Sequence, residues 1–345
     1  MNHKRVTIKE VAATAGVSTQ TVSRVVNGRP DVAPDTREHV QTVIQQLGYR
    51  PSKIARSLIQ GQSMTLGVVS FGIGLYGPSL ELQGIQEASE QAGYSLMLNI
   101  LPDAEKFDAD KILSNILSYH VDGILWAVPE IGQNRDWTQA LLHNLTVPIV
   151  FLNVQPRPHQ TTVVINNRMG GKLATRHLLE QGRERIGIIT GPMSWWEARQ
   201  RELGWREELL ANGRSVDESY IAHGDWTPQS GERGLQMLLD WHPNMDALFA
   251  CNDQMVLGAL NVARQKGLRV PEDLAIVGFD DIPEAPYFYP SLTTVRQNMI
   301  QLGREGVQQL ISLIENPDQG DLEAIRLHPE LIVRDSSILR LDSTK

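Results

Sequence analysis

The sequence predicts an α/β protein, with a small all-α domain at the N-terminus and a larger body of parallel β-sheets covered by helices. Two short helical patterns joined by a tight turn lie within residues 6–27. From residue 65 onward, apolar strand patterns alternate with helical stretches, and this alternation is typical of parallel sheets with helices on both faces. The 345 residues are enough for two or three domains and a large core.

The first helix is predicted by its capping residues. The hydroxyl of Thr7 can accept a hydrogen bond from the amide of Glu10, whose carboxylate can reach back to the cap. Gly16 supplies the left-handed residue that ends the helix, and the turn consists of Gly16 and Val17 alone. The apolar stripe of this helix consists of Val11, Ala12 and Ala15.

Ser18 begins a second helix that has one apolar and one polar face. Valines at positions 22, 25 and 26 can pack inward. The polar side chains of the other face are Thr19, Gln20, Ser23, Arg24 and Asn27. These groups suit base edges in a major groove, because arginine pairs with guanine and glutamine with adenine through two hydrogen bonds. The alternative is a helical hairpin whose polar face is only solvated.

A third helix is predicted over residues 34–47. Pro34 favours the first turn, and Val40, Val43 and Leu47 are spaced to face inward. Ala33, just before it, lacks the hydroxyl of a serine or threonine cap, which weakens this helix start by about 1 kcal/mol.

The segments IKEVAATAGVSTQTVSRVVNG, DTRE and LGYRPSKIARSL within residues 8–58 resemble the DNA-binding headpiece of the lactose repressor and galactose repressor (LacI/GalR) family of transcriptional regulators. The similarity continues to about Arg334, with NDQMVLGAL from Asn252 and VGFDD from Val277 as its most specific later pieces. The resemblance implies a helix-turn-helix headpiece and a two-lobed, periplasmic-binding-protein-like body with parallel sheets. It also implies DNA contacts from Thr7, Ser18, Thr19, Gln20, Ser23, Arg24 and Asn27.

The resemblance divides the chain into a headpiece (residues 1–50), a hinge (51–62) and an effector-binding and dimerisation body (63–345). It implies an N-lobe of about 63–162 and 292–324 and a C-lobe of about 163–291 and 325–345, although nothing in the local pattern reveals these crossings. Within the hinge it implies a helix that forms only on the operator, with Ala55 and Leu58 at the DNA and Leu58 entering the minor groove. The alternative is a plain linker.

Composition and charge distribution agree with a soluble DNA-binding protein. Hydrophobic residues make up 41% and charged residues 21% of the chain. Neither a membrane-spanning apolar run nor a signal peptide is recognisable, so we expect a cytoplasmic protein. The single cysteine, Cys251, excludes an intrachain disulfide. Residues 1–62 carry a net charge of +5 and the rest of the chain −13, so the basic charge is concentrated where phosphates are expected to bind.

The body is expected to alternate strands and helices. The strands are predicted at residues 66–71, 95–100, 123–127, 149–152, 185–190, 220–223, 247–250 and 274–279. Predicted helices between them include residues 80–92, 169–181, 197–212 and 254–266.

Gly72, Gly74 and Gly77 spell the G-x-G-x-x-G pattern of dinucleotide sites after the first body strand. In a dinucleotide site the glycine loop leads directly into a helix, and an acidic residue follows the next strand. Here Pro78 interrupts the entry into the helix, and Asn99 lies in that next strand. We therefore expect a ligand-lining loop and no cofactor. The enzyme alternative is a nicotinamide-dependent oxidoreductase.

No catalytic or metal site assembles from the sequence. The nine histidines are scattered without metal-ligand spacing, and Cys251 lies in an apolar strand, as expected of an inert thiol. Asp280 and Asp281 could perform acid and base chemistry, but carboxylates at the end of a parallel strand serve a binding crevice equally well. We therefore expect a protein that is not an enzyme.

Polar and aromatic residues near predicted strand ends indicate a ligand site. Carboxylate, amide and guanidinium groups around an aromatic ring are suited to hold a polyol. By match to the family's sugar-site positions, the candidate effector-binding residues are Leu152, Asn153, Arg201, Trp226, Asn252, Asp280 and Gln297. Asn153 replaces a family aspartate and Phe71 a family serine, which leaves the ligand open. The sequence assigns no role to Trp126, Trp195 and Trp196.

Taken with the resemblance, the sequence predicts a homodimeric repressor that binds a pseudo-palindromic operator in double-stranded DNA and is released by a small sugar, with a galactoside as first choice. A dimer, and no tetramer, is expected because the eleven residues after Arg334 are too few to form a stable coiled coil. The alternatives are a nucleobase or other small ligand acting as co-repressor, and a sugar-binding transport protein with a similar body.

Overall fold

The computed structural model describes residues 6–49, 62–319 and 323–339, and the chain divides into an N-terminal unit, residues 1–64, and a body, residues 65–345. The N-terminal unit contains the three predicted helices: α1 (Ile8–Ala15), α2 (Thr19–Val26) and α3 (Pro34–Leu47). The Thr7 capping box and the left-handed Gly16 are confirmed. Buried valines and alanines from all three helices form one small core. The predicted DNA contacts of Ala55 and Leu58 lie outside the described residues.

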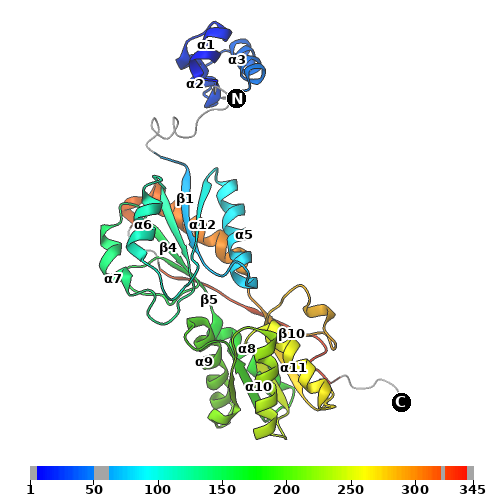
Figure 1. Ribbon diagram of the computed structural model, residues 1–345. Coiled ribbons are helices and arrows are strands. Elements are labelled where there is room, and N and C mark those ends of the chain that lie inside the picture. Colours follow the sequence, from blue (N-terminus) through cyan, green and yellow to red (C-terminus); the bar gives the residue numbers. More distant parts are fainter. Residues whose placement is uncertain (1–5, 50–61, 320–322, 340–345) are drawn as a thin grey trace. The chain divides into compact units, whose positions relative to one another are not determined.

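One α/β lobe of the body, which we call the N-lobe, is built from residues that follow β1 together with α12 and β11 from the C-terminal part of the chain (Figure 1). Its sheet has the order β11-β5-β4-β3-β1-β2, with all neighbours parallel. The strands are β1 (Thr65–Ser70), β2 (Ser95–Ile100), β3 (Gly123–Ala127), β4 (Ile149–Leu152), β5 (Thr162–Ile165) and β11 (Ile325–Leu327). Helices α5 (Tyr76–Gln91) and α12 (Met299–Glu315) share one apolar core with the sheet, and α6 (Ala109–Leu117) and α7 (Trp137–Leu141) share another.

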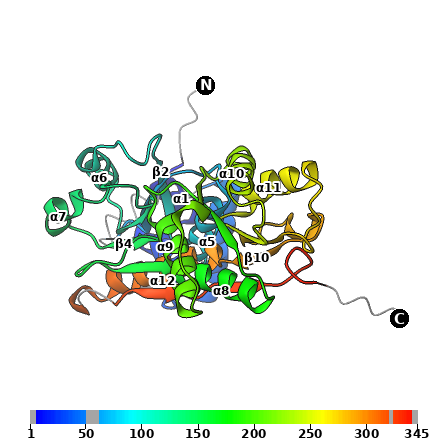
Figure 2. The same ribbon diagram turned by 90° about the horizontal axis from the view of Figure 1, so that it is seen from below.

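The second sheet builds the C-lobe, with the order β12-β10-β9-β8-β6-β7. Only β12, at its edge, is antiparallel to its neighbour. The strands are β6 (Ile186–Thr190), β7 (Ile221–His223), β8 (Ala247–Ala250), β9 (Ala275–Asp280), β10 (Thr293–Arg296) and β12 (Glu330–Ile332). The helices are α8 (Asn167–Glu180), α9 (Trp196–Ala211), α10 (Pro228–Trp241) and α11 (Asp253–Gln265). Helix α8 packs against α9, and α10 against α11 (Figure 2).

The predicted strands are confirmed with shifts of at most one residue, but the expected lobe boundaries need correction. Strand β5 lies in the N-lobe sheet up to Ile165, although residues from 163 were assigned to the C-lobe. Strand β10 was expected in the N-lobe but pairs with β9 in the C-lobe. Strand β11 was expected in the C-lobe but pairs with β5 in the N-lobe. The physical reason is that an isolated strand pattern does not specify its partner: β10 pairs with β9, which immediately precedes it among the strands, whereas the edge strand β11 pairs with β5 from far back in the chain.

Helix α5 also corrects the interpretation of the glycine pattern. It begins at Tyr76, four residues before the predicted start, so Gly77 and Pro78 lie in its first turn. Proline is tolerated there because the first amides of a helix have no carbonyl partner within the helix. The start of the helix therefore lies closer to the end of β1 than the position of Pro78 predicted.

Candidate functional site

A cavity of about 180 Å³ lies between the two lobes of the body. Its walls come from the start of α5 and the ends of β3 and β4 in the N-lobe, and from the start of α9 and the loops after β7, β8 and β10 in the C-lobe. This position, at the carboxyl ends of parallel strands, is where open α/β sheets bind ligands.

The structure brings every candidate effector-binding residue to this one cavity. Its lining includes Leu152, Asn153, Arg201, Trp226, Asn252, Asp280 and Gln297. Each of them except Arg201 lies at the end of a strand or within three residues after one, which is why the sequence pattern could place them. That they contact an effector stays a prediction.

Arg201 is the cationic centre of the C-lobe wall. Its Nε donates to Asn167 Oδ1 at 2.8 Å, and its Nη1 donates to the carbonyl of Cys251. The guanidinium also lies 3.8 Å from the ring centroid of Phe279, a cation–π contact. Gly171 of α8 allows this arrangement, because a Cβ there would lie 2.2 Å from the carbonyl oxygen of Arg201. The packing of α8 on α9 therefore fixes the arginine at the cavity.

Asp280 faces Arg201 across 3.7 Å, measured from Oδ1 to Nη1. The same Oδ1 accepts a hydrogen bond of 2.6 Å from Gln297 Nε2. Burial raises the pKa of Asp280 to about 6, while Arg201 and the Gln297 hydrogen bond oppose the rise. Gln297 Oε1 is buried without a partner in the described structure, so it remains available to a ligand donor. Asp281 instead pairs with Arg296 and Arg334, which separates its role from that of Asp280.

Trp226 forms the aromatic wall and is half-buried. Its backbone is left-handed, with φ of 71°, and its ring packs on Gly191, where a Cβ would lie 2.0 Å from the indole. Trp195 meets it edge-on, with ring centroids 5.9 Å apart. Asn252 supports the loop by donating to the carbonyl of Trp226 at 3.0 Å. A ligand can therefore use only part of the ring.

Sequence reasoning missed several residues of the lining, chiefly the acidic residues Glu81 and Glu197 and the aromatic Trp195. Glu197 lies in the first turn of α9 and Arg201 one turn later, so the spacing of four residues was a signal that both share one face. Asn153 Nδ2 donates to Glu197 Oε1 at 3.1 Å across the lobes.

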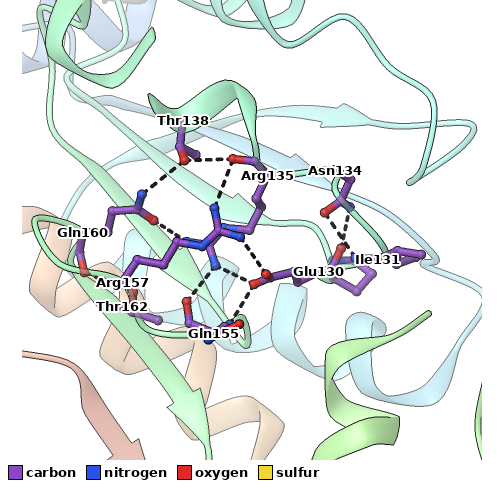
Figure 3. Close-up of polar contacts among 10 residues, drawn as sticks. Glu130, Ile131, Asn134, Arg135, Thr138, Gln155, Arg157, Gln160 and Thr162 are labelled. Atoms are coloured by element: carbon purple, nitrogen blue, oxygen red, sulfur yellow. Dashed lines mark hydrogen bonds and ion pairs between the residues drawn. The ribbon is translucent and has the colours of Figure 1, made fainter. Parts of the chain in front are cut away.

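The cavity is bordered by a buried ionic cluster in the N-lobe, centred on Glu130 (Figure 3). Glu130 Oε2 accepts from Arg135 Nη1 at 2.6 Å and from the amide of Gln155 at 2.9 Å. Its Oε1 accepts from Arg157 Nη2 at 2.8 Å. Arg135 is fully buried, and burial lowers its pKa while Glu130 opposes that change. The cluster therefore depends on the Glu130 carboxylate to compensate a buried guanidinium.

This cluster also holds the loop through which the lobes meet. The carbonyl of Glu130 accepts a bond of 2.9 Å from the amide of Trp196, and the amide of Gly132 donates to the carbonyl of Ser194 at 2.9 Å. Ile131 and Trp195 form an isolated antiparallel bridge between these two segments. Trp195 also lines the cavity, so this contact between the lobes includes a residue of the cavity wall.

The remaining tryptophans and Cys251 have structural positions. Trp126 is buried in β3 and packs against Phe107 and Trp137 in the N-lobe core. Trp196 is buried at the start of α9. Burial raises the pKa of the Cys251 thiol to about 12, as expected of an inert side chain.

In the N-terminal unit, Thr19, Gln20, Arg24 and Asn27 are exposed on one face of α2, while Ser23 is half-buried. Thr7 and Ser18 are also exposed, but their hydroxyls cap α1 and α2. Arg24 Nε lies 3.4 Å from Asp31 Oδ2, an exposed pair that costs little to separate. Their contacts with DNA stay predictions. Over the described residues, no helix is long and apolar enough to cross a membrane.

Comparison with known proteins gives matches to both parts of the chain. Residues 7–52 match the profile of bacterial regulatory proteins of the lacI family, and residues 175–337 match a periplasmic binding protein-like domain. The chain is 37% identical over 334 residues to the HTH-type transcriptional repressor PurR of Haemophilus influenzae, covering 96% of this chain and 98% of the relative. It is 35% identical to the HTH-type transcriptional regulator CelR of Thermobifida fusca, with coverage of 96% and 98%.

Solved structures show the same similarity. A crystal structure of the lac repressor dimer bound to operator and the anti-inducer ONPF matches with a TM-score of 0.86 at 30% identity, covering 97% of this chain and 100% of that one. A complex of the transcriptional regulator CelR with cellobiose matches with a TM-score of 0.72 at 34% identity, covering 96% and 100%.

Proposed function

Because this chain belongs to the lacI family of bacterial regulatory proteins, we propose that it is a transcriptional repressor whose affinity for operator DNA is controlled by a small sugar bound between the lobes. The observation that carries the proposal is the cavity wall itself. It combines the guanidinium of Arg201, the carboxylate of Asp280 and the amide of Gln297 beside the ring of Trp226. Planar polar groups around an aromatic face are suited to bind a polyol.

The identity of the sugar is the finer part of the proposal. Among sugars, a galactoside is the first choice and cellobiose the next, because the matching CelR structure is a complex with cellobiose. A thermal-shift screen of the full chain against mono- and disaccharides, with and without operator DNA, tests this directly. A ligand that fills the cavity should raise the unfolding temperature, since it binds the folded state alone. If no sugar raises it, the cavity does not serve the proposed ligand class.

A nucleobase acting as co-repressor is the second candidate. The match to proteins named PurR, at 37% identity, favours keeping it, and the amides and carboxyls of the cavity could pair with the edges of a base. The sign of the effect separates the two: an inducing sugar weakens operator binding, whereas a co-repressing base strengthens it. Adenine, guanine and hypoxanthine therefore belong in the same screen.

Reading of bases by α2 gives the first prediction. Gln20→Ala and Arg24→Ala should each lower operator affinity by about 1–3 kcal/mol and relax sequence preference, because each removes a bidentate base contact. Electrophoretic or anisotropy titrations on operator and random duplexes measure both effects. Gln46→Ala, at an exposed position of α3, is the matched control and should leave operator affinity unchanged. Equal losses on operator and random DNA would show that these side chains only contact phosphates.

Self-association gives the second prediction. We propose a homodimer because the edge strand β2 exposes Leu98 and Ile100, each 42% accessible, on the surface of the N-lobe. Replacing both with lysine should weaken dimerisation at least a hundredfold, since each buried aliphatic side chain contributes about 1.5–3 kcal/mol. Sedimentation at micromolar concentration should then show monomers. Leu210→Lys, at an exposed position of α9, should remain dimeric. A monomeric wild type would contradict the proposal.

A further inference from the structure

The charges that line the cavity are unbalanced. Three acidic side chains, Glu81, Glu197 and Asp280, line it with one cationic side chain, Arg201. Arg201 lies within ion-pair distance of Asp280, whereas no ion pair joins Glu81 or Glu197 to a cation among the described residues. Two buried carboxyl groups therefore face the ligand space without an ion-pair partner among the described residues.

Both carboxyl groups are held in place and have a free oxygen. Glu81 is only 5% exposed, and its helix is fixed against α12 because Gly303 packs directly on the carbonyl oxygen of Glu81. Its Oε1 is buried without a hydrogen-bond partner. Glu197 is 6% exposed and uses Oε1 to accept from Asn153, while its Oε2 is also buried without a partner. The two groups reach the cavity from opposite lobes.

Burial disfavours the charged form of both carboxyl groups and so raises their pKa values. Burial raises the pKa of Glu81 to about 8, and the charge of Glu197 contributes to the rise. Burial raises the pKa of Glu197 to about 7; Arg201 and Arg199 oppose this rise, and Glu130 adds to it. At pH 7 Glu81 is therefore mostly protonated and Glu197 about half protonated, and a cation placed beside them would favour their ionised forms and release protons.

Resting on the proposed function, we propose that Glu81 and Glu197 together receive a primary ammonium group of the effector, so that the ligand class is a hydroxylated amine such as an amino sugar. An ammonium group offers three donors and no acceptor, which matches carboxylates that can only accept. It also stabilises the ionised carboxylates that burial disfavours, whereas a neutral hydroxyl would leave both groups largely protonated. Arg201, Asp280, Gln297 and Trp226 remain available for the rest of the sugar.

The test is calorimetric binding to the full chain at pH 7 with matched pairs of ligands. The pairs are galactose with galactosamine, glucose with glucosamine, and each hexose with its 6-amino-6-deoxy derivative. At least one amine should bind tenfold or more tightly than its neutral parent. Its binding enthalpy should also depend on the buffer at pH 6.5, because ammonium binding deprotonates the two carboxyl groups and releases protons to the buffer.

Glu81→Gln and Glu197→Gln should each remove most of the preference for the amine and reduce the proton release. Glutamine has the shape of a protonated glutamic acid, so both variants are expected to fold. Glu90→Gln, at an exposed position of the same helix as Glu81, is the control and should retain the preference.

Two outcomes would overturn the inference: every neutral sugar binds as tightly as its amine, or both glutamine variants keep the amine preference. The proposed function fails separately. If an amine binds as expected but leaves operator affinity unchanged, the ligand inference holds and the regulatory function does not. If neutral sugars weaken operator binding without any preference for amines, only the ligand inference is lost.

Discussion

Alanine in place of Arg201 is expected to make operator binding insensitive to effector, with a loss of effector affinity of roughly a hundredfold. Hydrogen bonds to a charged group contribute about 1.5–3 kcal/mol each, and each 1.4 kcal/mol is a factor of ten in affinity. The substitution also leaves the buried Asp280 without the guanidinium 3.7 Å away. Trp226→Ala should have a smaller effect of about tenfold, since it removes roughly 1–2 kcal/mol of apolar contact.

The measurement is operator affinity titrated with effector for the wild type and both variants. Operator binding without effector should be nearly unchanged in both, because the DNA-reading face belongs to the N-terminal unit. That binding also shows that the variants are folded. Arg264→Ala, at an exposed position of α11, is the matched control and should respond like the wild type. A normal response from Arg201→Ala would place the effector elsewhere.

Alanine in place of Glu130 is expected to lower the free energy of unfolding of the body by about 3–5 kcal/mol, because it leaves a buried guanidinium uncompensated. Arg135 is fully buried and donates to Glu130 at 2.6 Å. Arg157 loses the same carboxylate, although it is partly exposed and can be solvated. Urea denaturation followed by tryptophan fluorescence measures the change, since Trp126 and Trp137 lie in the core of the same lobe.

Glu90→Ala is the control for this substitution, because its carboxylate is exposed on α5. It should change the free energy of unfolding by less than about 0.5 kcal/mol. A loss of under 1 kcal/mol for Glu130→Ala would mean that water or another group compensates Arg135, contrary to the buried cluster described above.

The headpiece could be predicted almost completely from the sequence, because its signals are local. The capping box joins Thr7 and Glu10, the turn glycine follows directly, and α3 begins and ends at the residues that its pattern indicates. Eight body strands were located to within one residue, since each is a short apolar run, but β5, β10, β11 and β12 were not predicted. In the cavity, Asn153, Trp226, Asn252, Asp280 and Gln297 could be placed because each follows or ends a strand.

Features that depend on distant pairing could not be predicted in the same way. Strand β11 pairs with β5, across more than a hundred residues. Glu81 reaches the cavity only because α5 begins early and packs closely on α12. Glu130 and its two arginines form a cluster that no periodicity reveals, since it joins two loop segments. These features depend on tertiary packing, which a local pattern of sequence does not specify.

The central claim is that a ligand in the interlobe cavity controls operator binding. It is tested most directly by fluorescence anisotropy of the full chain on an operator selected from random duplexes, with and without the ligand that stabilises the body most. We expect at least tenfold weaker binding to operator at saturating sugar, with binding to random DNA unchanged. An operator affinity that stays constant with every ligand that stabilises the body would contradict the account.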